Sequence, residues 1–215
     1  KRGRLFCRKM EKPKVSIAIP YYDTPKTAYF LYRLLFSINQ QTFKDYEIVL
    51  TNEPGMAHNH NAAILKSKGE IIKLMQMDDY FADPNSLKNI VAHFKSEWMI
   101  VGCAHIKEGY NKVFNEHQPE WTDDIINGNN RLGGLSTLVI RNETKMLFDE
   151  SMTWVVDCDL YKRYYDKYGL PQIIKSPLVI IDMGEHRLSS TLSDELKLEE
   201  IERLLNRYGY TGKLQ

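Results

Sequence analysis

The first hundred residues alternate between short apolar runs and longer segments that carry apolar residues at helical spacing. The runs are rich in β-branched residues and predict four strands, at 14–20, 46–52, 71–77 and 98–106. The segments between them predict three helices, at 27–42, 57–67 and 85–95. The first helix has residues on or near one stripe, namely Tyr29, Tyr32, Leu35, Phe36 and Asn39. Because such alternation is typical of βαβ units, we predict an α/β fold with a mostly parallel sheet that helices cover on both faces.

The pattern loosens after residue 105. The polar stretch 109–134 predicts a long loop, which in a compact domain is usually functional or disordered. Further elements are expected in four segments: a strand at 135–142, a helix at 157–169, one or two strands at 171–184, and an amphipathic helix at 194–210. We therefore expect a single domain over 13–215, with a smaller antiparallel element in its second half.

The composition limits the class of protein. The chain has 215 residues, enough for one domain with a sizeable core and too few for two. Its 29 basic and 28 acidic residues give a net charge of +1, which offers no electrostatic argument for nucleic-acid binding. The basic opening at 1–12 is expected to be a solvated tail, with a membrane or partner contact as the alternative. Because the chain starts at Lys1, we expect it to be part of a longer polypeptide with further domains.

The sequence also bears on the compartment. No apolar run reaches the roughly 18 residues of a membrane span, and no segment resembles a signal peptide. The cysteines, Cys7, Cys103 and Cys158, are odd in number and never have CxxC spacing. This argues against a disulfide framework or a zinc site, and it favours a reducing compartment such as the cytoplasm.

Two adjacent carboxylates, Asp78 and Asp79, follow the predicted strand that starts at Ile71. The carboxyl end of a buried strand is where an open α/β sheet binds its ligands. Unpaired, the two groups would repel each other and raise a pKa, and a divalent cation removes that conflict. The alternative is a lead-in to the next helix, with Asp83 as N-cap and Pro84 at the first helical position. That alternative explains Asp83 but leaves the adjacent pair without a role.

Segments that cover most of the chain, in the same order, resemble the GT-A-fold glycosyltransferases, most of all the large inverting family 2. The segments are VSIAIPYYD, LLFSINQQTFKDYEIVLTNE, GMAHNHNAAILKSKGEIIKLMQMDDYF and FDESMTWVVDCDLYKRYYDKYG. The resemblance implies a Rossmann-like domain that transfers a sugar from a UDP-sugar to a hydroxyl of a glycan acceptor. It implies a nucleotide-sugar-binding half at 13–105 and an acceptor and catalytic half at 106–215. A domain of a larger viral or bacterial glycan-assembly protein, such as those of chlorella viruses, would fit.

The resemblance further implies a donor site along the carboxyl edge of the sheet. Tyr21 or Tyr22 could stack on a uracil ring, and Asp23 could accept from its imide or from a ribose hydroxyl, with surface turn residues as the alternative. The expected contacts to the nucleotide sugar are Pro20, Tyr21, Tyr22, Asp23, Asn52, Glu53, His58, Asn61, Asp78, Asp79, Gly134 and Ser136.

Two of these segments have open alternatives. His58 stands where arginine is usual in the family, and the segment 55–61 could equally be a helix N-terminus with Asn59 and Asn61 as polar surface. The small residues at 133–136 resemble a segment that lets the backbone approach the donor sugar, and a plain tight turn is the alternative.

The metal site is also implied by the resemblance. Asp78 and Asp79 match a short acidic motif in which Met77 replaces the first carboxylate. Asp79 would bind Mn²⁺ or Mg²⁺ that bridges the diphosphate, with Asp78 nearer the ribose. His186 resembles a late His-x-x-x-Ser segment and would be a metal ligand or a phosphate contact, with Arg187 and Ser190 as donors. A structural histidine is the alternative.

Asp157 matches the position of the family's catalytic base, after a Glu that is Val156 here. Beside an apolar wall such as Trp154, its pKa could be raised so that it deprotonates an acceptor hydroxyl. Asp157 could instead be a helix N-cap, as could Asp159. A single base suffices for inversion, and the missing Glu leaves the stereochemistry open. Trp121, with Glu120, could stack on an acceptor sugar or pack in an interface or core.

Two other functions are alternatives to a glycosyltransferase. A non-catalytic nucleotide-sugar-binding module would bind the donor without turnover. A sugar-phosphate nucleotidylyltransferase would need a glycine-rich, basic loop after the first strand, where this chain has PYYDTPK.

Overall fold

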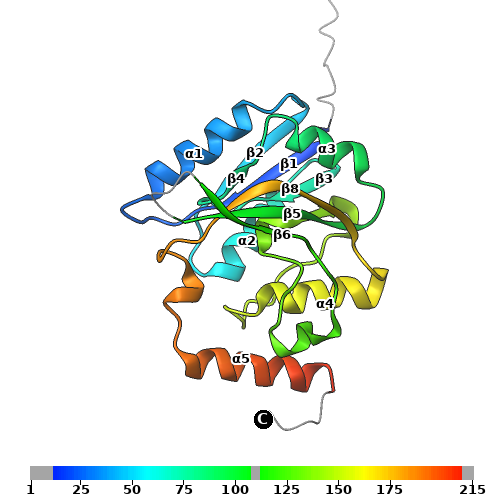
Figure 1. Ribbon diagram of the computed structural model, residues 1–215. Helices are drawn as coiled ribbons and strands as arrows, with labels where there is room; N and C mark the ends of the chain where they lie inside the picture. Colours follow the sequence, from blue (N-terminus) through cyan, green and yellow to red (C-terminus); the bar gives the residue numbers. More distant parts are fainter. Residues whose placement is uncertain (1–11, 108–111, 210–215) are drawn as a thin grey trace, which may run out of the picture.

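The computed structural model describes residues 12–107 and 112–209 (Figure 1). The predicted basic tail, apart from Lys12, lies outside the described residues. Eight strands form one sheet, in the order β2-β1-β3-β7-β5-β8-β4, with β6 paired to β5. The strands are β1 (Val15–Pro20), β2 (Tyr46–Thr51), β3 (Ile71–Leu74), β4 (Tyr80–Phe81), β5 (Trp98–Ile106), β6 (Val113–His117), β7 (Leu138–Arg141) and β8 (Gln172–Asp182).

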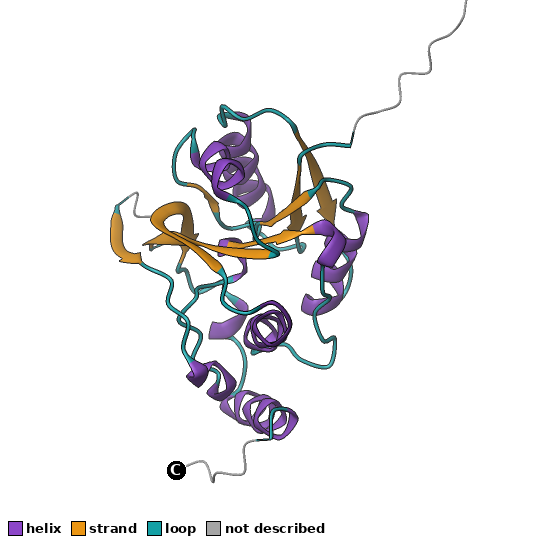
Figure 2. Ribbon diagram, turned by 90° about the vertical axis from the view of Figure 1, so that its right-hand side faces the viewer, coloured by secondary structure: helices purple, strands orange, loops and turns teal. Residues whose placement is uncertain are grey.

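Helices cover both faces of this sheet (Figures 1 and 2). They are α1 (Thr27–Asn39), α2 (Met56–Lys66), α3 (Ser86–His93), α4 (Val156–Tyr168) and α5 (Asp194–Arg207). Short 3₁₀ turns lie at Asp123–Asn127, Leu135–Thr137, Asn142–Thr144 and Leu188–Ser190. One core packs α1 and α3 against the sheet, and the other packs α2, α4 and the end of α5 against the opposite face. The predicted α/β domain with helices on both faces is therefore confirmed.

The sheet is mixed in direction. β1 pairs in parallel with β2 and β3, and β5 pairs in parallel with β8. β7 lies between β3 and β5 and runs antiparallel to both, while β6 and β4 add antiparallel pairs at β5 and β8. The antiparallel share is larger than the sequence suggested, because β7 sits in the middle of the sheet. The pairing of strands distant in sequence is not encoded in the pattern of either strand.

Helix α1 buries a different stripe from the one that stands out in its sequence. Phe30, Leu34 and Ile38 are buried, and the last two pack in the core between α1 and the sheet. Tyr29, Tyr32 and Phe36 face outward, with 54%, 70% and 55% of their surface exposed. Both sets recur at helical spacing, so periodicity alone could not decide which one faces the sheet.

No helix in the described ranges combines the length and apolar character that a membrane crossing requires.

The burial of α1 predicts unequal effects of two substitutions on the same helix. Leu34→Ala should lower the free energy of unfolding by about 2–5 kcal/mol, because it leaves a cavity between α1 and the sheet. Tyr32→Ala, at an exposed position of α1, is the matched control and should change it by no more than about 0.5 kcal/mol. Urea unfolding of both variants measures the difference. Equal losses would contradict the orientation of α1.

Candidate functional site

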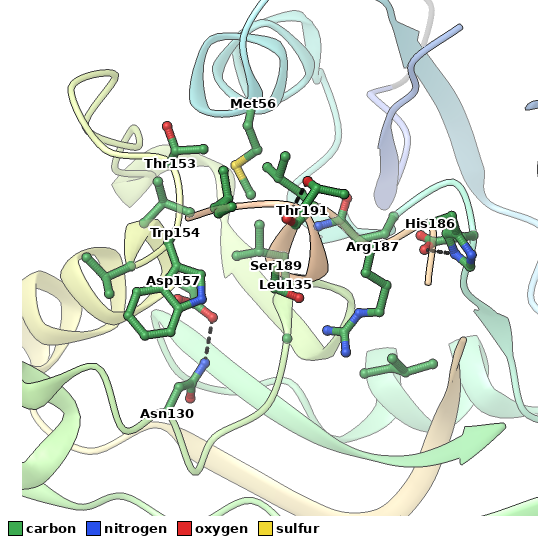
Figure 3. A pocket seen from close by; sticks show the side chains of 18 of the residues that line it. Met56, Asn130, Leu135, Thr153, Trp154, Asp157, His186, Arg187, Ser189 and Thr191 are labelled. Carbon is green, nitrogen blue, oxygen red and sulfur yellow. Dashed lines mark hydrogen bonds and ion pairs between the residues drawn. The ribbon is translucent and has the colours of Figure 1, made fainter. Parts of the chain in front are cut away.

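A cavity of about 790 Å³ opens at the carboxyl ends of β1 and β3, the sheet edge that the sequence indicated. Four segments form most of its wall: the turn 76–79 after β3, the loop 128–135, the start of α4 at 153–158, and the segment 186–192 before α5. Figure 3 shows Asn130, Trp154 and Asp157 together at one end, and His186 and Arg187 at the other.

The turn after β3 brings Asp78 and His186 together. The Nε2 atom of His186 lies 2.8 Å from Oδ2 of Asp78. The guanidinium of Arg33, from α1, donates to the backbone carbonyl of Asp78 and forms an ion pair of 2.8 Å with Asp182. The acidic turn is thus fixed from the side of α1, and the Asp78 side chain is presented to the cavity.

Asp79 lines the same end of the cavity but is almost completely buried. Its Oδ1 accepts a hydrogen bond of 3.0 Å from the backbone N–H of Asp182. Burial, and then the charge of Asp78, raise the pKa of Asp79 to about 8, while a hydrogen bond from the Ser136 side chain opposes the shift. Without a cation, the ionised form of Asp79 is therefore disfavoured.

A buried lysine lies inside the sheet near this carboxyl group. Lys73 of β3 donates from Nζ to the backbone carbonyl of Leu74 (2.9 Å) and to that of Ser136. Burial lowers the pKa of Lys73 to about 7, and the charge of Asp79 acts in the opposite direction. An ionised Asp79 therefore favours the protonated form of Lys73.

These residues fit a hard divalent cation. Asp78 and His186 offer an oxygen and a nitrogen ligand side by side, and the raised pKa of Asp79 is the response of a buried carboxylate that lies beside a second one. Within the described ranges, no group of three or more His, Cys, Asp or Glu side chains is arranged to hold a metal ion. A cation here would therefore take its remaining ligands from a bound diphosphate and from water, as Mg²⁺ commonly does.

Asp157 is the second residue of α4 and lines the opposite end of the cavity. Its Oδ1 accepts from the backbone N–H of Cys158 at 2.8 Å, and its Oδ2 accepts from the side-chain amide of Asn130 at 2.7 Å. Burial raises the pKa of Asp157, and the hydrogen bond from Asn130 opposes this shift. The N-cap of α4 is Val155, so Asp157 does not have the N-cap role that the sequence allowed.

Asp159 is also not a cap. Its buried carboxylate pairs with Arg163 and Arg207 and accepts from the hydroxyl of Tyr208. It therefore joins α4 to α5, away from the cavity.

A buried carboxylate from α5 holds the loop before α4. Glu200 accepts from the backbone N–H groups of Thr153 (2.7 Å), Trp154 (2.7 Å) and Val155 (3.1 Å). These N–H groups belong to the loop and to Val155, the N-cap residue of α4, so Glu200 holds the chain at the point where α4 begins. This contact fixes Trp154 as part of the cavity wall.

Only some of the expected donor contacts line the cavity. Those that do are Tyr22, Asp78, Asp79 and Gly134, together with His186 and Asp157. Asp23 and Asn52 instead form an exposed pair at the ends of β1 and β2, where Asn52 donates to Asp23 at 2.9 Å. Pro20 is buried within β1, and Tyr21 and Glu53 lie beside this pair without lining the cavity.

Three other expected contacts have structural partners. His58 is exposed and lies 3.2 Å from Glu150. Asn61 is buried and exchanges hydrogen bonds with the backbone of Phe148, so it ties α2 to the segment before α4. Ser136 is buried beneath the cavity and bonds the backbone N–H of Gln76 as well as Asp79.

The alternative in which Asn59 and Asn61 are polar surface is wrong, because both are buried. Asn59 accepts from the backbone of Glu53 and donates to that of Tyr21, which fixes the ends of β1 and β2. Trp121 stacks on Tyr165 at 4.1 Å between ring centroids and lies outside the cavity.

Sequence reasoning did not identify several residues that line the cavity or support its wall. Arg33, Asn130 and Glu200 lie in a helix or loop where nothing in the local pattern marks them. Two others had a usable signal: Lys73 is a lysine inside an apolar strand, and Asp182 is a carboxylate at the end of a strand, as the pair after β3 is. Ser189, rather than the expected Ser190, lines the cavity next to Arg187.

The solved structures that this chain resembles include glycosyltransferases. The S. aureus TarS 1-349 structure in complex with UDP matches with a TM-score of 0.65 and 17% identity, over 94% of this chain and 67% of that chain. Its complex with UDP-GlcNAc matches with a TM-score of 0.64 and 17% identity, over 94% and 68%. The Pyrobaculum calidifontis mannosyltransferase PcManGT, in complex with GDP-Man and Mn²⁺, matches with a TM-score of 0.55 and 14% identity, over 96% and 67%.

At these identities the likeness shows the fold alone, and the expected GT-A-like α/β class is confirmed. The chain spans about two thirds of the length of these neighbours. No protein-family model and no curated protein matches the sequence.

The raised pKa of Asp79 predicts how stability depends on pH without divalent cations. Between about pH 5 and pH 7 the native carboxyl keeps a proton that the unfolded chain releases, so this group lowers stability as pH rises, by at most about 1.4 kcal/mol per pH unit. The asparagine of Asp79→Asn cannot ionise, so this variant should lack the decrease in stability with rising pH. The free energy of unfolding of Asp79→Asn, minus that of the unmodified protein, should therefore be larger at pH 7 than at pH 5.

Urea unfolding at the two pH values, in the presence of a chelator, measures this difference. Asp83→Asn, which removes an exposed carboxylate in the next turn, is the matched control and should show no such increase. A difference for Asp79→Asn that stays constant or shrinks as pH rises would contradict the assignment.

Proposed function

We propose that the chain is a metal-dependent glycosyltransferase that moves a sugar from a UDP-sugar to a hydroxyl of a glycan acceptor. The observation that carries the proposal is the distribution of groups in one cavity. His186 and Arg187 lie at one end, where His186 contacts Asp78 and Asp79 follows in the same turn, and the half-buried Asp157 lies at the other end. One end therefore suits a diphosphate with its cation, and the other suits a proton acceptor.

The donor diphosphate is proposed to lie between the turn after β3 and the segment before α5. Arg187 and Ser189 line this part of the cavity and can donate to phosphate oxygens. The nucleoside is proposed to extend toward Tyr22 and the exposed Asp23–Asn52 pair at the ends of β1 and β2. The UDP complexes of TarS support a uridine donor, and the GDP-Man complex of PcManGT makes GDP-sugars the comparison to include in a test.

Mn²⁺ or Mg²⁺ is proposed to be held by Asp79 and His186, with Asp78 close by, so that the acidic pair would act as the short acidic motif that it resembles in family 2. When bound, the ion neutralises charge on the departing nucleoside diphosphate. The Mn²⁺ in the PcManGT complex supports this assignment.

The reaction is proposed to be a direct displacement. Asp157 accepts the proton of the acceptor hydroxyl while that oxygen forms a bond to the anomeric carbon and the bond to the diphosphate oxygen breaks. A single carboxylate at the acceptor end supports inversion, as expected of family 2. Its raised pKa makes Asp157 a stronger base than an exposed aspartate.

A screen of UDP-sugars and GDP-sugars with Mn²⁺, with release of the nucleoside diphosphate as readout, tests the proposed activity. Asp79→Ala should abolish release that depends on the metal, because the cation loses its proposed ligand. Asp83→Asn is the control and should release at the unmodified rate. Unchanged metal-dependent release by Asp79→Ala would reject the metal site. Donor binding without release under any condition would favour a non-catalytic binding module.

Asp157→Asn should lower transfer by about 10²- to 10⁴-fold, because the acceptor proton loses its base. The affinity for UDP with Mn²⁺, measured by calorimetry, should stay unchanged, because Asp157 lies at the end of the cavity away from His186, the partner of Asp78. Asp166→Asn removes an exposed carboxylate of the same helix and serves as control. Full turnover by Asp157→Asn would reject it as the base.

A further inference from the structure

Asn130 uses every hydrogen-bonding group of its side chain at the cavity wall. Its Nδ2 donates to Oδ2 of Asp157 at 2.7 Å and to the backbone carbonyl of Gly133 at 2.8 Å. Its Oδ1 accepts from the backbone N–H groups of Leu132 at 2.9 Å and of Gly133 at 3.2 Å. An amide has two N–H donors and two acceptor lone pairs, so this side chain cannot turn without losing bonds.

These bonds join two parts of the cavity wall that are distant in sequence. Gly133 has a φ of +106°, in the left-handed region, and a Cβ there would lie 3.1 Å from Cγ2 of Thr137. The turn that Asn130 closes is therefore one that favours glycine. Gly134, which follows Gly133 in this turn, lines the cavity. Asn130 thus ties the glycine turn to the carboxylate at the start of α4.

The carboxylate of Asp157 has no other donor from outside its own helix among the hydrogen bonds of the described residues. Oδ1 is held by the N–H of Cys158, in α4 itself, and Oδ2 is held by Asn130. A carboxylate offers about four lone-pair sites. Two remain, so an acceptor hydroxyl can still reach an oxygen whose direction Asn130 has set.

We propose that Asn130 is a positioning residue for glycosyl transfer, which fixes the carboxylate of Asp157 against the glycine turn and favours its ionised form. The inference rests on the proposed function, in which Asp157 receives the acceptor proton. Asn130 itself forms no bond with either substrate in this role.

Among the side chains around Asp157, that of Asn130 opposes the rise in its pKa most strongly, and the Cys158 thiol, within α4, acts in the same direction to a smaller extent. The titratable groups that interact with it are Cys158 and Tyr161, both in α4, and burial followed by the charge of Asp157 raises the pKa of each. Both therefore stay neutral near pH 7. From outside α4, Asp157 is faced by the amide of Asn130 and by the indole of Trp154. Neither group carries a charge.

Removal of the amide should therefore move the pH dependence of the reaction. In Asn130→Ala, the acidic limb of the kcat profile should move upward by about one to two pH units, because a hydrogen bond to the ionised carboxylate is lost. At a fixed pH below the midpoint of the acidic limb in both proteins, kcat of the variant should be lower by about 10-fold for each pH unit by which that midpoint moves. The affinity for UDP with Mn²⁺ should not change.

Two further variants make the test specific. Asn130→Asp keeps an oxygen for the N–H groups of Leu132 and Gly133 but places a second carboxylate against Asp157, so its acidic limb should move further than that of Asn130→Ala. Asn127→Ala removes an exposed amide of the same loop, which bonds Asp124 outside the cavity, and should leave the profile unchanged.

The outcomes separate this inference from the proposed function. If the unmodified protein transfers no sugar from any donor, the proposed function fails first. If it transfers sugar and folded Asn130→Ala and Asn130→Asp keep the unmodified acidic limb and kcat, the positioning role is overturned. Thermal unfolding and UDP calorimetry establish that each variant is folded. Should Asn130→Ala not fold, the pH profile of Asn130→Asp, which retains an acceptor for the N–H groups of Leu132 and Gly133, decides alone.

Discussion

The site depends most on the burial of one carboxylate, that of Asp79, at the end of the sheet. A buried carboxyl group is costly unless hydrogen bonds or opposite charges compensate for the lost water. Here the carboxylate accepts hydrogen bonds from the backbone N–H of Asp182 and from the hydroxyl of Ser136, and it interacts electrostatically with the buried Lys73. These partners come from β8, the 3₁₀ turn before β7, and β3. The same bonds that satisfy Asp79 therefore hold three separate chain segments together at the cavity.

A second buried carboxylate organises the opposite wall in a similar way. Glu200 of α5 accepts three backbone N–H groups from the loop that leads into α4. The ion pairs of Arg207 with Asp149 and Asp159 secure the same helix to the domain. Helix α5 is thus an anchor for the end of the cavity that carries Asp157. Since the segment 186–192 connects β8 to this helix, the docking of α5 also sets where His186 and Arg187 lie.

Much of the frame could be predicted from the sequence because it is local. The strands β1, β2, β3 and β5 and the helices between them are each encoded by one apolar run with a clear period. The acidic pair after β3 was singled out because strand ends can be located from such runs, whereas Asp157 was singled out by its match to a position in family 2. The expected boundaries also differ little from the observed ones, as in β5, which occupies the predicted 98–106.

What the sequence could not supply depends on contacts between distant residues. The insertion of β7 between β3 and β5 follows from packing of the whole sheet, and β4, with two residues, is too short to show a period. Asn130 meets Asp157 across 27 positions, and Glu200 meets Thr153 across 47. The partners of two expected donor contacts are distant for the same reason: Asn61 bonds the backbone of Phe148 and Ser136 bonds that of Gln76, and neither side chain lines the cavity.

Asp79 and Asp157 show how environment separates two identical side chains in one cavity. Burial raises the pKa of both. At Asp79 the charge of the adjacent Asp78 adds to the effect, so a cation would relieve both causes at once. At Asp157 burial is opposed by a neutral amide, and no second carboxylate adds to it. A group in the first setting is suited to hold a metal ion, whereas a group in the second can gain and lose a proton without disturbing a neighbouring charge. The two roles thus follow from what surrounds each carboxylate.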